Sequence, residues 1–181
     1  IPFNEYTNCW SISGSGASLT SVGRIISVQE FTSNGTWSRP TGCTRVHVLC
    51  VGGGGGARPE FGGDKKNSAY NGQDGGEGGM AEEVIDVTST SSVSVTIGAA
   101  GAANGAGGTT SFGSFCSATG GAAGTGNYPG SGLGANGTGS GGHINRSHNN
   151  GGYHGSRGTR GGTGASRTTT GVVGVVYVIN Y

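Results

Sequence analysis

Charge and proline are scarce in this chain, and both absences limit what it can be. Charged residues make up only 10% of the 181 residues, and the formal net charge is +1. Disordered segments usually carry high net charge and few β-branched residues, whereas valine, isoleucine and threonine are frequent here. Four prolines and an interrupted glycine period exclude a collagen triple helix. We therefore expect a folded protein.

Helical periodicity and long apolar runs are also missing. No apolar segment approaches the length of a membrane span, and no signal-peptide pattern is present. The length suits a single domain. The chain begins with Ile1 rather than methionine, so we expect a fragment or a processed product.

The residues of common catalytic and metal sites are not grouped. The four cysteines form no CxxC pair and have no metal-ligand spacing. We expect Cys50 to be a small buried apolar residue, and a Cys9–Cys43 disulfide is the alternative use of cysteine. No acid follows Asp86, and no nucleophile–base–acid set stands out. The sequence therefore predicts neither an enzyme nor a bound cofactor or metal.

Glycine is what the chain has in excess, with 43 residues of 181. From Gly152 to Gly164 a glycine stands at every third position, and shorter tracts repeat this spacing, as at Gly98 and Gly101. Three residues per turn is the repeat of the polyproline II helix, whose backbone groups have no internal partner. A bare glycine edge lets another extended chain approach closely. We therefore predict a bundle of glycine-rich extended helices that forms a rigid stem.

Short strands are predicted between the glycine tracts. Residues 44–51 alternate, with Val46, Val48 and Cys50 on one face. Asn34-Gly35 predicts a hairpin between the runs before and after it, because both residues tolerate a type I′ turn. Further predicted strands are a second hairpin of residues 83–87 and 93–97, a short strand with Phe112 and Phe115, and a buried closing strand in residues 168–181. The predicted fold is all-β, with short antiparallel strands combined with glycine-rich polyproline-II-like (polyglycine II) helices.

Two short motifs have other interpretations. Residues 52–57 satisfy the letters of a dinucleotide-binding GxGxxG motif, but Pro59 and further glycines follow, so the required helix cannot form. Residues 155–162, GSRGTRGG, resemble an RNA-binding Gly-Arg tail, yet that segment holds only Arg157 and Arg160. The four arginines after Asp86 make this end weakly basic, which suits either an anionic partner or simple solvation.

Three insertions between glycine tracts hold the candidate binding residues. They are residues 57–74, 127–130 and 143–157, and they concentrate aromatic, amide and cationic side chains. Loops on a rigid scaffold are a usual place for a binding surface, and the alternative is that they are solvated loop tips. The predicted receptor-binding residues are Arg58, Phe61, Lys65, Lys66, Tyr70, Asn127, Tyr128, His143, Asn145, Arg146, His148, Tyr153, His154 and Arg157.

Residues 30–56, EFTSNGTWSRPTGCTRVHVLCVGGGGG, resemble the opening of the glycine-rich domain of bacteriophage tail fibre proteins. That opening reads F-T-x-x-G-T-W-x-x-P-x-G before a valine-rich strand and a glycine run. The segments GGEGGMAEEVIDV, SVSVTIGAAG, GGTTSFGSFCSATGG and GVVGVVYVINY follow in the family's order. The resemblance covers residues 28–181 and leaves residues 1–27 as a linker or the end of a preceding fibre region.

This resemblance implies a distal tail fibre domain, or adhesin, on the virion, assembled in the host cytoplasm. Its implied ligand is a bacterial surface receptor, either lipopolysaccharide or polysaccharide or an outer-membrane protein, without nucleic acid or membrane insertion. Other tail fibre chains are implied partners, as a homotrimer or with the tip as a single chain. Two alternatives from other classes are a structural glycine-rich protein, such as a wall component or antifreeze-like bundle, and RNA binding through the Gly-Arg segment.

Overall fold

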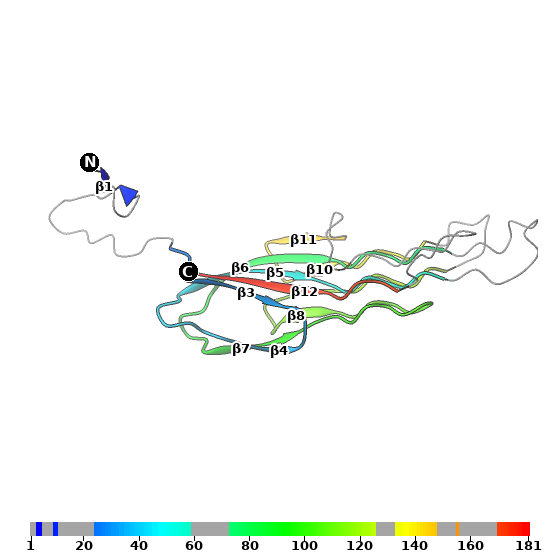
Figure 1. The fold of residues 1–181 in the computed structure, drawn as a ribbon, viewed down its shortest axis with the longest axis horizontal. Coiled ribbons are helices and arrows are strands. Elements are labelled where there is room, and N and C mark those ends of the chain that lie inside the picture. The colour runs from blue at the N-terminus through cyan, green and yellow to red at the C-terminus, as the bar shows by residue number, and fades with distance from the viewer. Residues whose placement is uncertain are drawn as a thin grey trace, which may run out of the picture.

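The computed structural model describes residues 24–58, 73–125, 133–147, 155 and 170–181, with the backbone of residues 3–4 and 9–10 (Figure 1). All regular elements in these ranges are strands, and none is a helix. The strands are β1 (Phe3–Asn4), β2 (Cys9–Trp10), β3 (Ser27–Phe31), β4 (Gly35–Ser38), β5 (Arg45–Val51), β6 (Met80–Asp86), β7 (Ser92–Thr96), β8 (Thr110–Phe112), β9 (Cys116–Ala118), β10 (Gly139–Ser140), β11 (Ile144–Arg146) and β12 (Val175–Asn180).

Ten of these strands form two five-stranded sheets, and the predicted all-β fold is confirmed at this level. Sheet I has the order β10-β9-β8-β7-β4, and sheet II has the order β11-β6-β5-β12-β3. Every pairing is antiparallel. The short strands β1 and β2 pair only with each other.

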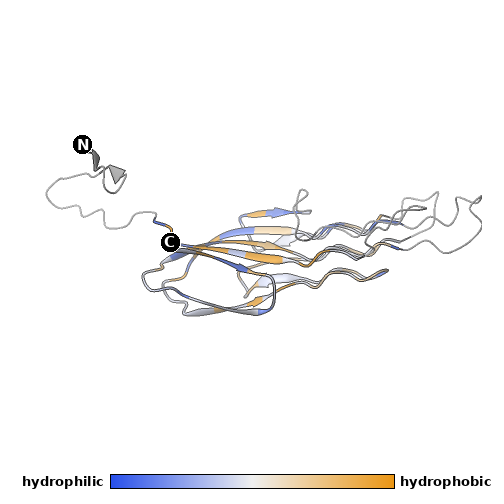
Figure 2. Cartoon of the chain, in the orientation of Figure 1, coloured by the Kyte–Doolittle hydropathy of each residue, from blue (hydrophilic) through white to orange (hydrophobic). Residues whose placement is uncertain are grey.

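The two sheets pack face to face around one core. Hydrophobic residues gather along the strands of both sheets (Figure 2). The Trp37 and Phe112 rings of sheet I meet edge to face, with centroids 5.7 Å apart. The other buried members of this core are Cys43, Val46, Val48, Cys50, Ala81, Ile85, Val87, Val93, Val95, Cys116, Ala118, Val176 and Val178. A sandwich of this kind needs one apolar face from each sheet, and the alternation in the strands supplies it.

The clearest strand predictions are confirmed. In β5, Val46, Val48 and Cys50 point into the core and are fully buried. The closing strand is β12, which lies inside sheet II between β5 and β3 and buries Val176 and Val178 completely. Residues 110–118 form two strands, β8 and β9, rather than one, because the chain turns at residues 113–115.

Both predicted hairpins are wrong. β3 pairs with β12 in sheet II, whereas β4 pairs with β7 in sheet I, so Asn34-Gly35 carries the chain across the sandwich. The Asn34 side-chain oxygen accepts a hydrogen bond from the Ile97 amide at 2.8 Å instead of closing a two-residue turn. β6 and β7 likewise belong to different sheets. The local turn signal is correct, but each strand gains more by pairing with distant strands that bury its apolar face.

The Cys9–Cys43 disulfide is also wrong. Cys43 is a buried free thiol that donates to the Arg45 carbonyl oxygen at 3.3 Å. Cys50 is buried, as predicted. The thiol of Cys43 is therefore part of the core and not a crosslink.

Extended glycine segments continue the strands beyond one end of the sandwich (Figure 1). The amides of residues 52, 55 and 58 donate to carbonyls of segment 73–79 at 3.0, 2.9 and 2.7 Å. The amides of residues 53 and 56 donate to carbonyls of segment 105–109. The amide of residue 54 donates to a carbonyl of segment 170–174. Successive amides thus point in three directions, with a period of three residues. In a sheet they would alternate between two directions.

Close approach explains why these segments are glycine. A Cβ added to Gly52 or Gly55 would lie closer than 3.0 Å to the carbonyl of Thr119 or Ala122. Segment 52–57 is completely buried among its neighbours. Some positions where the backbone faces solvent hold alanine instead, as at Ala102. Most of the regular run 152–164 lies outside the described residues; Gly155 alone is described there, and its amide donates to the Val173 carbonyl at 3.0 Å.

Candidate binding surfaces

Two of the three predicted insertions arise from the same end of the glycine segments. The Arg58 amide donates to the Gln73 carbonyl at 2.7 Å, which closes the base of insertion 57–74. The Gly134 amide donates to the Asp74 carbonyl at 2.9 Å, and the Gly124 amide donates to Gly56 at 3.0 Å. The bases of insertions 57–74 and 127–130 therefore lie side by side.

The opposite end of the molecule is where the described chain enters and leaves the sandwich. The Tyr181 amide donates to the Arg45 carbonyl at 2.9 Å, and the Thr44 amide donates to Tyr181 at 2.8 Å. Arg24 lines a pocket together with Tyr181. Figure 1 shows this end far from the tips of the glycine segments. Residues 24 and 181 therefore lie at one end of the sandwich, and the glycine segments extend from the other.

Most predicted receptor-binding residues lie outside the described part of the chain. These are Phe61, Lys65, Lys66, Tyr70, Asn127, Tyr128, His148, Tyr153, His154 and Arg157. Arg58 is described and is half-buried at the base of its insertion. Its backbone amide has a partner there, so Arg58 belongs to the end of the glycine segments.

The third insertion begins elsewhere than expected. Asn145 and Arg146 lie on β11, where they pair with Ala81 and Met80 of β6, and His143 directly precedes that strand. These three residues were predicted to lie in a loop, and the structure places them at the edge of sheet II. The three-residue strand β11 could not be recognised from the sequence, because it has no alternation of apolar and polar residues of its own.

His143 and Asn145 are held by neighbours rather than free. The Glu83 carboxylate accepts the His143 backbone amide at 2.6 Å and lies 2.8 Å from His143 Nδ1. Asn145 donates to the Gly142 carbonyl at 2.6 Å and accepts its amide at 3.2 Å. These contacts fix the turn that carries the chain from sheet I to sheet II.

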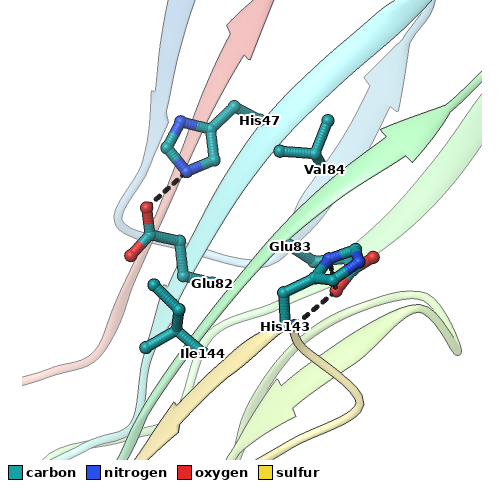
Figure 3. Close-up of a pocket in the computed structure, with 6 residues that line it drawn as sticks. All are labelled: His47, Glu82, Glu83, Val84, His143 and Ile144. Atoms are coloured by element: carbon teal, nitrogen blue, oxygen red, sulfur yellow. Dashed lines mark hydrogen bonds and ion pairs between the residues drawn. The ribbon is translucent and has the colours of Figure 1, made fainter.

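A shallow cavity of about 270 Å³ lies beside this turn (Figure 3). His47 of β5 points toward Glu82 of β6, with 2.6 Å between Nε2 and Oε1. Val84 and Ile144 line the cavity and are 52% and 42% exposed. Apolar side chains between two acid–imidazole pairs can bind an apolar group that carries a polar substituent. In the described part of the chain, no three His, Cys, Asp or Glu residues gather as metal ligands.

This cavity belongs to a larger apolar surface, the outer face of sheet II. The register places Val28, Ile179, His47 and Val84 in one row across four strands. The next row is Glu30, Tyr177, Leu49, Glu82 and Ile144. The outward residues of β4 and β7 in sheet I are instead serine and threonine. The sandwich therefore has one polar and one largely apolar outer face.

The Tyr177 side chain on this face is partly shielded from water. Its hydroxyl donates to the Glu30 carboxylate at 3.1 Å. Partial desolvation, together with the hydrogen bond to Glu30 and its charge, raises the pKa of Tyr177 above its ordinary value. Sequence reasoning missed this surface. Its signal was present, since β5 and β12 carry apolar residues on both of their faces.

The chain was compared with known proteins and protein families. A search of curated proteins found no match. No helix in the described part of the chain is long and apolar enough to cross a membrane. A family model described as a glycine-rich domain matches residues 29–177. That span covers most of the chain, from within β3 to within β12, and the chain therefore belongs to this glycine-rich domain family.

Proposed function

We propose that this chain is the receptor-binding tip of a bacteriophage tail fibre. One observation carries the proposal: the bases of two polar insertions lie together at the end of the glycine segments, opposite the end where residues 24 and 181 lie. An adhesin needs this polarity, because it must be anchored at one end and present its binding loops at the other. The resemblance of residues 28–181 to tail fibre glycine-rich domains supports the same conclusion.

We also propose that the glycine segments are polyglycine II helices. The three-residue period of hydrogen bonds between segment 52–58 and its neighbours supports this, since three directions of bonding match a three-residue turn. A bundle of such helices would hold the insertions rigidly, and rigid presentation lowers the entropy lost when a loop binds.

The proposed ligand is a receptor on the bacterial surface, either a polysaccharide or an outer-membrane protein. Aromatic rings of Tyr70 and Tyr128 would stack on sugar or apolar surface, and Lys65 and Lys66 would meet phosphate or carboxylate groups. The tip would act on the virion, after assembly in the host cytoplasm, together with other fibre chains. This proposal includes neither nucleic acid nor an enzymatic step.

The test is binding of the purified chain to susceptible cells. Replacing Tyr70, Tyr128 and Tyr153 by alanine should lower cell binding by at least tenfold, because each is a large contact side chain. A control with Thr41→Ala and Ser89→Ala alters exposed residues of the sandwich itself and should bind like the parent. Unchanged binding of the triple variant, with an intact fold, would refute the loop assignment.

The purified chain also distinguishes the adhesin from an RNA-binding protein and from a structural glycine-rich protein. An RNA-binding protein would retain nucleic acid and lose it steeply as salt rises. A purely structural glycine-rich protein would bind neither cells nor RNA. Saturable binding to cells at moderate salt is expected only of the adhesin.

A further inference from the structure

Two cysteines from opposite sheets meet inside the core. Cys50 lies on β5 of sheet II and Cys116 begins β9 of sheet I. Their sulfur atoms are 3.4 Å apart. Both residues are buried, and both are free thiols. This is the contact distance of two thiols that are not bonded, and each faces the other directly.

The surroundings allow the sheets to come this close. Ala81 is the β6 partner of Cys50, and Ala118 lies on the inward face of β9 two residues after Cys116. Both alanines are fully buried. Sulfur atoms in a disulfide are about 2.05 Å apart, so closure requires an approach of about 1.4 Å. Side-chain rotation with a small shift of short strand β9 can supply it.

The third described thiol provides an internal comparison. Cys43 donates to the Arg45 carbonyl, and its nearest side-chain partner is the Asn180 amide oxygen at 3.9 Å. It is buried as deeply as Cys116. Burial alone therefore does not distinguish the pair, and the facing geometry does.

We propose that Cys50 and Cys116 are a redox-sensitive pair that closes into a disulfide between the two sheets. The oxidant is a small uncharged peroxide, such as hydrogen peroxide, which can enter a packed core. The chemistry does not depend on the proposed function. When the disulfide forms does depend on the proposed function. A virion protein leaves the reducing cytoplasm on release, and outside the cell it meets no thiol pool that would reduce the bond.

The reaction balances in two steps. Cys116 loses its proton, and its thiolate attacks one peroxide oxygen; the oxygen–oxygen bond breaks, sulfenic acid forms, and the departing hydroxide takes up the lost proton and becomes water. The Cys50 sulfur then attacks the Cys116 sulfur and expels the hydroxyl group, which leaves as water with the Cys50 proton. Two thiols and one peroxide give one disulfide and two waters. Either thiol can donate the hydrogen bond between them; this contact lowers the pKa of Cys116 and raises that of Cys50, which favours Cys116 as the first nucleophile.

The test uses the full chain purified under reducing conditions. After peroxide treatment, the protein is denatured, its remaining thiols are blocked with N-ethylmaleimide, and unreduced peptides are mapped by mass spectrometry. A peptide pair joined through Cys50 and Cys116 is expected, together with a rise in the unfolding midpoint of roughly 5–10 °C that dithiothreitol reverses. Cys43→Ala should leave both results unchanged, whereas Cys50→Ala should abolish them.

Other products would overturn the proposal. These are a bond to Cys9 or Cys43, unchanged thiols, or sulfinic acid at Cys116 without a crosslink. If Cys50→Ala does not fold, the peptide map of the parent protein still decides. Cell binding measured on the same samples separates the two proposals, since a disulfide without cell binding refutes only the adhesin, and binding without a disulfide refutes only the redox pair.

Discussion

At the scale of single residues, one buried amide connects the two sheets. Asn180 of β12 is fully buried, and its side-chain oxygen accepts the Trp37 indole N–H of β4 at 2.9 Å. Its amide group donates to the Ser27 hydroxyl oxygen at 3.0 Å and to the Ser27 carbonyl at 3.2 Å. Burying any of these polar atoms without a hydrogen-bond partner would cost free energy. The contact is therefore satisfied only when Trp37 of sheet I lies beside Asn180 of sheet II, so Asn180 specifies how the two sheets pack.

Replacing Asn180 by leucine should destabilise the protein by about 1–3 kcal/mol, because the Trp37 N–H then remains buried without its acceptor. Unfolding in urea, followed by circular dichroism, measures this. In a Trp37→Phe background the indole donor is gone, so the same Asn180→Leu change should cost clearly less. Strictly additive effects of the two substitutions would contradict the proposed coupling.

At the scale of elements, the glycine segments replace side-chain packing with backbone contact. Segment 52–58 is surrounded by other segments, and its amides are satisfied in three directions. Gly52, Gly53, Gly55 and Gly56 leave no room for a Cβ, whereas an outward position such as Ala102 carries one. The element is therefore stabilised by hydrogen bonds and close backbone packing, and it needs few apolar residues.

Gly55→Ala should destabilise the chain by roughly 1–3 kcal/mol, since the new Cβ would lie closer than 3.0 Å to the carbonyls of Ala122 and Gly121. Thermal unfolding followed by circular dichroism measures the effect. Gly35→Ala is the matched control on β4, because its Cβ would meet only the Phe31 ring at 3.5 Å, an ordinary contact. Equal destabilisation by both variants would show that close approach is not the cause.

At the scale of the whole molecule, the sandwich has two unlike outer faces. Sheet II exposes Val28, Val84 and Ile144 at 60%, 52% and 42%. Sheet I exposes Ser92, Ser94 and Thr96 of β7. Apolar patches of this kind usually mark contacts with other chains. We expect the outer face of sheet II to contact a second copy of the chain.

Val84→Glu should weaken self-association at least tenfold, because a carboxylate in an apolar contact loses its hydration without gaining a partner. Sedimentation equilibrium over a concentration series measures the dissociation constant. Ser94→Glu adds the same group to the outer face of sheet I and should leave association unchanged. A parent chain that stays monomeric at every concentration would exclude this contact between copies.

The sequence alone determined the all-β class and the strongest strands. Alternation in residues 45–51 and the apolar run at residues 175–180 identified β5 and β12, because a period of two follows directly from strand geometry. Glycine spacing indicated extended segments that pack through a bare edge. None of these inferences requires knowledge of a distant part of the chain.

Only the tertiary structure decided how the strands are paired. Asn34-Gly35 and residues 88–91 mark true changes of direction, yet both connect different sheets, since sheet choice depends on partners that are distant in the sequence. The position of His143 beside Glu83 and the meeting of Cys50 with Cys116 depend on the same long-range register. Local patterns determine which residues point inward, and the energy of burying both sheets together determines what they meet.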